Sequence, residues 1–471
     1  MQAGSEQDWA WAEFGAAELG DTRRRDRLVQ IARELGEHPE LSLPQALSNK
    51  AALKAAYRFF DNNDISREQI LAAHIASSVT RMAGQPVILA AQDTTFIDYS
   101  GHPDTEGLGP LHDKGGWGMV CHGTLAFTPE RVPLGVLGIR VWARDPQQLQ
   151  QRQTRRKRAI EDKESYKWID SVQAVAALKA QLPGTRLVSL ADRESDVFEF
   201  FTAASALGVD LLTRVAWDRN VQGPEGKLFA QLAAAPVLAH KDLLIPARAK
   251  RPARTAKLEI RACPLTLQAP LNGSARALAP ISLWGVWAYE PNAPEGAQPL
   301  DWKLLSSIPV ASPEDALERL QWYAARWGIE QWHRVLKSGC RIQARQLESF
   351  DRLCRLLTVY AVIAWRILYA TMLARLVPEM SCTAILNDDE WQALYCRIHH
   401  SPAPPATPPP LRQAIHWIAQ LGGFLARASD GEPGTQTLWK GFQQLIPMTE
   451  MYRIMKPPKM SKPSRKNVGN D

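Results

Sequence analysis

Two aspartates stand where a carboxylate is costly unless it has a partner. Asp93 closes the strand pattern VILAAQD, residues 87–93, and Asp192 closes the strand pattern LVSLAD, residues 187–192. Burial of an unpaired charge is unfavourable, so each of these aspartates needs a cation beside it. Two such carboxylates at one sheet edge, joined by Glu330 from a helix, would supply three hard oxygen ligands. This set is typical of a site for two Mg²⁺ ions, about 3.5–4 Å apart, that catalyses phosphoryl transfer, with Mn²⁺ as a substitute.

Glu330 also belongs to a line of polar residues in the segment YAARWGIEQWHRVLK, residues 323–337. At about 100° per residue, Tyr323, Arg326, Glu330 and Lys337 share one narrow face of a continuous helix. Arginine and lysine beside the carboxylate would bind phosphate, the first through a planar fork and the second as a point charge. An ordinary surface ion pair between Arg326 and Glu330 explains part of the same pattern. This helix alone leaves both interpretations open.

A mixed α/β region must position these residues. The apolar runs that end in the two aspartates predict strands, and a helix begins after Ser312 with Pro313 in its first position. Strand patterns also cover residues 116–127, 132–143 and 209–217, and helical patterns cover residues 166–182 and 197–207. Three strands followed by helix, strand, helix and strand predict a mixed sheet covered by helices. Residues 220–310 alternate like strands and predict a β-rich insertion.

The first 70 residues predict helices with a concentrated positive charge. Asp21 or Thr22 caps a helix whose apolar residues recur at helical spacing. The positive side chains on this helix and the next are Arg23, Arg24, Arg25, Arg27, Lys50, Lys54 and Arg58. Cations at a helix N-terminus oppose the helix dipole, so local stability does not explain the arginines. A solvated face is one explanation, and contact with DNA phosphates is the one that the clustering favours.

The composition narrows the class of protein. The chain has 471 residues and a formal net charge of +7, which favours a polyanionic partner. The six cysteines are scattered without metal-site or disulfide-scaffold spacing, as in a reducing cytoplasm. The N-terminus lacks the pattern of a secretory signal. Residues 356–376 are apolar enough for a membrane span, but Arg366 in their middle favours a buried core helix.

The ordered set of motifs resembles the bacterial DDE cut-and-paste transposases of the insertion sequence 4 family, close in pattern to the transposase of transposon five. QDTT contains Asp93, ADRESD contains Asp192, and Glu330 falls in the signature Y-x2-R-x3-E-x6-K. The stretches DKESYKW, ARAKRPARTAK and LGGFLARASDGEPG are also similar to such proteins. Ala324, Ala325 and Ser195 depart from the usual residues without removing an expected ligand or phosphate contact.

The resemblance implies a mixed α/β fold with an RNase H-like catalytic core. Its implied domains are an N-terminal helical DNA-binding domain at residues 1–70, a DDE catalytic domain at residues 71–376 with the β-rich insertion at about 220–310, a C-terminal helical dimerisation domain at residues 377–455 and a basic tail at residues 456–471. A homodimer would bring two ends of double-stranded transposon DNA together and later bind target DNA. The expected location is the cytoplasm, on the nucleoid.

The family's residue roles carry over position by position. Asp93, Asp192 and Glu330 are the implied catalytic acids and the ligands of two Mg²⁺ ions. The DNA contacts that the resemblance implies are Tyr323, Arg326, Lys337 and Trp302, and Arg193 of the second block is a further predicted contact. The predicted DNA contacts on the N-terminal helices come from their clustered charge: Arg23, Arg24, Arg27, Lys54 and Arg58. Trp302 would hold a flipped base while a DNA hairpin forms, although packing on a strand explains a tryptophan there equally well.

Two other functions fit parts of the same pattern. A metal-dependent nuclease or junction resolvase on the same fold would use the acidic residues without an end-specific module. A transposition inhibitor descended from the enzyme would bind DNA without cutting it. The apparent DNA-binding helices argue against the first, and the intact acidic set argues against the second.

Overall fold

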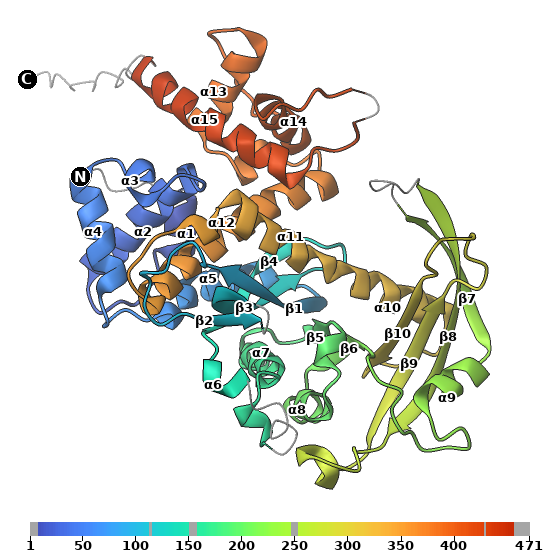
Figure 1. Ribbon diagram of the computed structural model, residues 1–471. Helices are drawn as coiled ribbons and strands as arrows, with labels where there is room; N and C mark the ends of the chain where they lie inside the picture. The colour runs from blue at the N-terminus through green and yellow to red at the C-terminus, as the bar shows by residue number, and fades with distance from the viewer. Residues whose placement is uncertain (1–7, 113–114, 150–157, 246–252, 428–429, 456–471) are drawn as a thin grey trace, which may run out of the picture. The chain divides into compact units, whose positions relative to one another are not determined.

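The computed structural model describes residues 8–112, 115–149, 158–245, 253–427 and 430–455 (Figure 1). The chain divides into two compact units, Met1–Met372 and Leu373–Asp471. The predicted basic tail and residues 247–252 of the basic stretch in the insertion lie outside the described residues.

The first unit begins with five helices that form their own apolar contacts. They are α1 (Trp9–Phe14), α2 (Thr22–Glu37), α3 (Leu43–Ala46), α4 (Lys50–Asp61) and α5 (Arg67–Met82). The Asp21 side chain caps α2 by accepting the Arg23 N–H at 2.8 Å, which confirms one of the two expected caps. Leu28, Ile31 and Leu35 form the buried face that the helical spacing predicts.

A single mixed sheet follows. Its strands are β1 (Val87–Asp98), β2 (Gly109–His112), β3 (Gly115–Phe127), β4 (Pro133–Trp142), β5 (Arg186–Ala191), β6 (Asp210–Arg214), β7 (Val237–Ile245), β8 (Arg254–Leu267), β9 (Ile281–Tyr289) and β10 (Asp301–Ser306). The strand order is β2-β3-β1-β5-β6-β10-β9-β8-β7, and β4 pairs with β3. β5 runs parallel to β1 and β6, whereas the other pairs are antiparallel. The prediction of a mixed sheet is confirmed.

Helices cover both faces of the sheet's first half (Figure 1). On one face, α7 (Tyr166–Ala176) and α8 (Phe198–Leu207) bury Trp168, Phe198 and Phe201 in the main apolar core. The opposite face carries α10 (Pro313–Ala325), α11 (Trp327–Arg334) and α12 (Phe350–Leu376). Two shorter helices, α6 (Pro146–Leu149) and α9 (Leu228–Ala234), lie in connections. The start of α10 is as predicted, because the Ser312 side chain accepts the Asp315 N–H and Pro313 follows directly.

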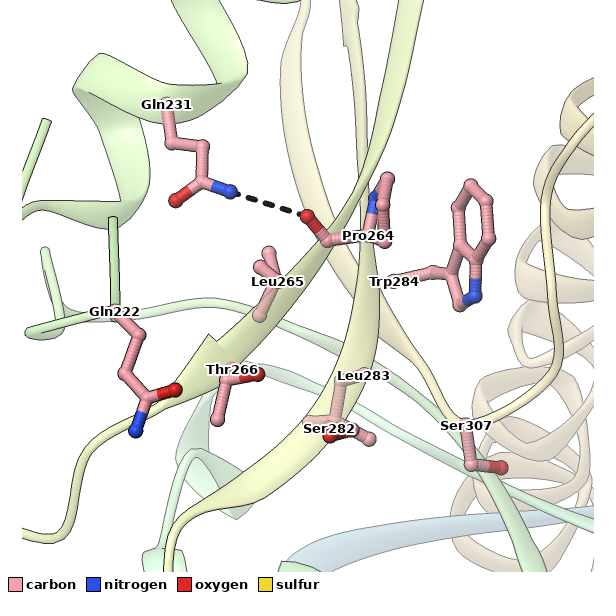
Figure 2. Close-up of a pocket in the computed structure, with 9 residues that line it drawn as sticks. All are labelled: Gln222, Gln231, Pro264, Leu265, Thr266, Ser282, Leu283, Trp284 and Ser307. Atoms are coloured by element: carbon pink, nitrogen blue, oxygen red, sulfur yellow. Dashed lines mark hydrogen bonds between the residues drawn. The ribbon is translucent and has the colours of Figure 1, made fainter. Parts of the chain in front are cut away.

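The β-rich insertion continues the same sheet. β10 pairs with β6, so that Leu304 lies opposite Arg214 and Ser306 lies opposite Leu212. A pocket of about 430 Å³ opens in this insertion (Figure 2). It is lined by Gln222, Gln231, Pro264, Leu265, Thr266, Ser282, Leu283, Trp284 and Ser307. None of these is one of the predicted acidic residues, so this hollow is not the predicted active site.

α12 is the one described helix that is long and apolar enough to cross a membrane. Of its most apolar stretch, 83% is buried inside the protein. Arg366, which interrupts its sequence, lies 4.9 Å from the Trp9 ring of α1. These contacts agree with the predicted core helix.

The second unit is helical. It contains α13 (Asp388–His399), α14 (Leu411–Leu421) and α15 (Thr435–Met455). α15 packs against both of the other helices. Near its end, Met451, Ile454 and Met455 are exposed. Their spacing of three and four residues puts them on one side of the helix.

Candidate active site

Asp93 and Asp192 lie on neighbouring strands. β1 continues to Asp98, so the expectation that Asp93 ends its strand is wrong. The reason is that β1 has two partners: its pairing with β5 ends at Ala91, whereas its pairing with β3 continues through Asp98. Asp93 therefore lies just beyond the last β1–β5 pair, and Asp192 follows the last residue of β5 directly. The two aspartates share one edge of the parallel part of the sheet.

The surroundings of Asp192 act on its ionisation. Burial raises the pKa of Asp192, and the negative charges of Asp93 and Glu194 raise it further. The Glu194 N–H donates to the Asp192 carboxylate at 2.8 Å and opposes the shift, as does the charge of Arg326. A cation at this edge would stabilise both carboxylates in their charged form.

A glycine lets α11 approach this edge. Gly123 of β3 pairs with Asp93 of β1. A Cβ at Gly123 would lie 2.7 Å from the Trp332 ring of α11, which is closer than real Cβ contacts. Trp332 is fully buried there and donates its ring N–H to the Ala361 carbonyl of α12 at 2.9 Å. This packing puts the helix that carries Glu330 beside Asp93.

The segment that carries the polar line is not one straight helix. α10 ends at Ala325 and α11 begins at Trp327, because the Arg326 N–H bonds the Tyr323 carbonyl in a tighter turn. Lys337 lies in a wider π-helical turn, Val335–Gly339. The expectation of one continuous face is therefore wrong in detail, since both turns change the register that 3.6 residues per turn assumes.

Arg326 lies between the carboxylates. Its Nη2 donates to Glu330 Oε1 at 2.6 Å, and its Nη1 lies 3.9 Å from Asp93 Oδ2. The residue is 8% exposed, and its Nε has no hydrogen-bond partner among the described residues. Burial alone would lower the pKa of Arg326, but Tyr323, Asp93 and Glu330 together hold it above its ordinary value. The surface-pair interpretation is therefore incomplete, because this buried guanidinium also faces Asp93.

His333 is a neighbour of the site that the sequence reasoning missed. Its Nδ1 lies 3.6 Å from Asp93 Oδ2, and the residue is buried. Its Nε2 has no hydrogen-bond partner within the described part of the chain. A possible signal was present in the sequence, because His333 follows Glu330 by three residues and so lies near it on a helix.

Tyr323 and Trp302 meet beside the acidic edge. Their ring centroids are 6.4 Å apart in an edge-to-face arrangement, which joins α10 to β10. Burial raises the pKa of Tyr323, whose phenol is within electrostatic range of Arg214 and Asp192. Trp302 is half-buried and pairs with Ala288 of β9. Trp302 thus packs on a strand and also lies near the site, so its position is compatible with both interpretations.

The other two predicted phosphate contacts near the acids, Lys337 and Arg193, differ in solvent exposure. Lys337 is half-buried, and burial lowers its pKa while Cys121 and Asp93 oppose the shift. Arg193 is exposed in the turn directly after Asp192. Both therefore lie in the region of the two aspartates.

The structure does not bring the N-terminal basic residues to the acids. The described side-chain contacts of the arginines on α2 stay within the N-terminal helices: Arg23 with Asp21 at 2.7 Å, Arg24 with Asp64 at 2.8 Å and Arg27 with Gln30 at 2.8 Å. Lys54 and Arg58 are exposed on one side of α4. Arg23 remains 89% exposed in its side chain despite its ion pair. These residues form a separate basic surface.

The described residues contain no group of three or more His, Cys, Asp or Glu side chains that could hold a metal ion as they stand. The cation found at the acids is Arg326 itself. Its pairing with Glu330 and its approach to Asp93 indicate that this edge accepts positive charge, and carboxylates are the ligands that Mg²⁺ prefers. The chemistry of the donors therefore fits the implied metal ions.

Two comparisons with known families define the class of protein. A transposase DNA-binding family matches residues 6–65, and the Tn5 transposase dimerisation domain matches residues 362–457. The chain is therefore a transposase that binds DNA. More particularly, it is a Tn5-like transposase, which confirms the resemblance seen in its motifs and is consistent with the insertion sequence 4 family. The matched dimerisation domain supports a homodimer.

Proposed function

We propose that this transposase carries out cut-and-paste transposition, with Asp93, Asp192 and Glu330 as its catalytic acids. The observation that carries the proposal is the meeting of three elements at one edge. Asp93 and Asp192 lie in and directly after neighbouring parallel strands, and Arg326, at the start of α11, pairs with Glu330 and faces Asp93. Acids and phosphate-binding cations together are what phosphodiester chemistry requires.

The sheet supports an RNase H-like core for this activity. Its first half has three antiparallel strands, β4, β3 and β1, continued by the parallel strands β5 and β6. Helices α7 and α8 connect the strands on one face. This is the arrangement that the family resemblance implies. The domain limits at residues 70 and 376 stay predictions.

Asp93, Asp192 and Glu330 would hold two Mg²⁺ ions. When bound, the ions would activate the attacking oxygen and stabilise the leaving one. The raised pKa of Asp192 is consistent with a carboxylate that gains stability from a nearby cation.

The other residues of the chain bind and orient DNA in this proposal. Arg326 and Lys337 contact phosphates beside the scissile bond, with Tyr323 packed under the arginine at 5.9 Å. Arg193 extends from the second acid's turn toward the same backbone. Five cations of α2 and α4 bind the terminal inverted repeat: the exposed Arg23, Lys54 and Arg58 and the half-buried Arg24 and Arg27.

The proposed reaction has four steps at one site. Water hydrolyses the phosphodiester at the transposon end and frees a 3′-hydroxyl. That hydroxyl attacks the opposite strand and closes a hairpin, while Trp302 stacks on a flipped base. A second hydrolysis opens the hairpin, and the 3′-hydroxyl then attacks target DNA. Two protomers would act on two ends in a paired complex.

The test uses the inverted repeats that border the gene, as duplexes with flanking DNA. Asp93→Ala, Asp192→Ala and Glu330→Ala should each bind the ends normally and fail to cleave them with Mg²⁺. Arg334→Ala, an exposed residue on the same helix as Glu330, is the matched control. Normal cleavage by any of the three acid variants would overturn the assignment. Cleavage of unrelated DNA would favour a nuclease, and end binding without nicking by the wild type would favour an inhibitor.

A further inference from the structure

Arg326 lies beside Asp93 and Glu330, two of the carboxylates that would bind the metal ions in the proposed reaction. Its Nη2 is hydrogen-bonded to Glu330 at 2.6 Å, whereas its Nη1 lies 3.9 Å from Asp93, beyond hydrogen-bond distance. Its Nε has no partner among the described residues. A guanidinium has five N–H donors, so Arg326 is hydrogen-bonded to one carboxylate and attracted by a second while its Nε donor remains unused.

We propose that Arg326 is a latch that shields Asp93 and Glu330 in the free protein and leaves them when a DNA phosphate arrives. The inference rests on the proposed function and adds an order to it. DNA binds first, and the divalent cations load second. A phosphate offers Arg326 two charged acceptors at once, which the present pair of carboxylates does not.

The backbone around Arg326 suits such a movement. The residue lies at the junction between α10 and α11, in the tighter turn where its N–H bonds the Tyr323 carbonyl. Its long side chain passes 5.9 Å from the Tyr323 ring, an aromatic surface along which a guanidinium is stable in more than one position. The two carboxylates lie on backbone in regular structure, Asp93 inside β1 and Glu330 within α11.

The charge balance explains why departure of the latch would favour cation binding. Asp93 and Asp192 lie on neighbouring parallel strands, and Arg326 pairs with Glu330 at 2.6 Å and lies 3.9 Å from Asp93. If Arg326 moves to a phosphate, Asp93, Asp192 and Glu330 lose a shared positive neighbour. A divalent cation then takes the place of the guanidinium beside the carboxylates. Without DNA, Arg326 stays there and the protein binds metal weakly.

The test measures Mn²⁺ binding to the full-length protein without DNA, from the electron paramagnetic resonance signal of the free ion. Arg326→Ala and Arg326→Gln should each bind Mn²⁺ roughly tenfold more tightly than wild type, since a cation about 4 Å from the ligands is removed. Arg334→Ala should match wild type. Adding an already cleaved end duplex should tighten Mn²⁺ binding by wild type and change it little in the Arg326 variants.

Equal Mn²⁺ affinity in wild type and both Arg326 variants, with each folded by circular dichroism, would overturn the latch. So would wild-type affinity that DNA does not change. Failure of the proposed function gives a different result: the tighter binding in Arg326→Ala would persist when Asp93 or Glu330 is also replaced by alanine. Loss of Mn²⁺ binding in those double variants would support the latch, because the ion that Arg326 excludes is then held by Asp93 and Glu330.

Discussion

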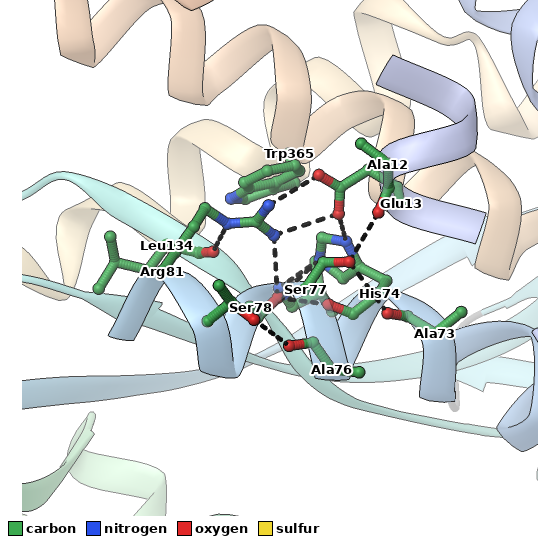
Figure 3. Close-up of polar contacts among 12 residues, drawn as sticks. Ala12, Glu13, Ala73, His74, Ala76, Ser77, Ser78, Arg81, Leu134 and Trp365 are labelled. Carbon is green, nitrogen blue, oxygen red and sulfur yellow. Dashed lines mark hydrogen bonds and ion pairs between the residues drawn. The ribbon is translucent and has the colours of Figure 1, made fainter. Parts of the chain in front are cut away.

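His74 Nδ1 lies 2.6 Å from a carboxylate oxygen of Glu13, although 61 residues separate the two in sequence (Figure 3). The Val136 N–H of β4 donates to His74 Nε2 at 2.9 Å, so the other ring nitrogen carries the proton toward Glu13. Arg81 also bonds Glu13, at 2.7 Å, and lies over the Trp365 ring of α12 at 4.3 Å. This buried network fastens the first N-terminal helix to α5, the sheet and α12.

The network predicts that the first unit loses stability in mild acid. Burial lowers the pKa of His74 below its ordinary 6.5, with Arg81 adding to the shift and Glu13 opposing it. The unfolded chain therefore binds more protons between the two pKa values, and stability falls as pH drops below about 6.5. Urea unfolding at about pH 7.5 and about pH 5 measures the difference. His74→Gln should flatten this dependence, whereas His240→Gln, an exposed residue of β7, should leave it unchanged.

Removing the charge of Glu13 predicts a large loss of stability. Glu13→Gln leaves Arg81 without its ion pair and weakens the bond to His74, which should cost about 3 kcal/mol of unfolding free energy. Glu18→Gln, an exposed residue nearby, is the control and should change it little. Equal unfolding midpoints for the two variants would show that the network does not stabilise the fold.

The sequence predicted most elements around the site because their signals are local. The cap at Asp21 and the start of α10 after Ser312 follow from side-chain hydrogen bonds within a few residues. The Glu13–His74 contact was not predictable in this way, because it depends on two helices meeting across the fold. The same applies to His333, whose nearness to Asp93 comes from the packing of α11 on Gly123.

The position of Asp93 within its strand was missed for a related reason. Its apolar run ends in QDTT, and a change to polar residues usually marks a strand end. β1 continues because β3 remains hydrogen-bonded to it through Asp98, a pairing that the sequence of β1 does not encode. The roles of the acids remain predictions that the cleavage experiments must test.

Glu194 provides a test of the charge at Asp192. Its negative charge helps to raise the pKa of Asp192, and protonated Asp192 cannot hold a cation. End cleavage should therefore fall as pH drops through this pKa. Glu194→Gln removes one cause of the shift, so the acid limb of the cleavage rate should move to lower pH. Glu225→Gln, in an exposed loop, should keep the wild-type profile, and an unmoved limb in Glu194→Gln would contradict the coupling.

Trp302 should affect one step more than the others. Trp302→Ala removes the ring that packs on Tyr323 and that we propose stacks on a flipped base. The first nick should proceed while hairpin formation slows by roughly tenfold, because stacking on one base contributes about 1–3 kcal/mol. Denaturing gels separate nicked from hairpin DNA. Trp217→Ala is the control, since this tryptophan is 68% exposed and follows β6. Equal slowing of both steps would indicate a packing role only.

The end of α15 should contribute to dimer formation. Met451, Ile454 and Met455 are exposed on one side of that helix, inside the segment that matches the dimerisation domain. Ile454→Glu should reduce the paired-end complex in native gels by at least about tenfold, because a buried charge opposes association. Leu425→Glu, at another exposed apolar position of the second unit, should assemble normally. Normal assembly of Ile454→Glu would exclude this surface.

The pairing of β10 with β6 has a mechanical consequence. A module attached by a flexible linker could turn freely, but β7 to β10 are joined through β6 to β5 and β1, the strands beside which the two aspartates lie. Shear or twist applied at the distal strands would therefore pass through the ladder to β5 and β1. Trp302 lies in β10 of this sheet. If it holds the flipped base as we propose, the sheet fixes the distance between that base and the cleaved phosphodiester before any chemistry begins.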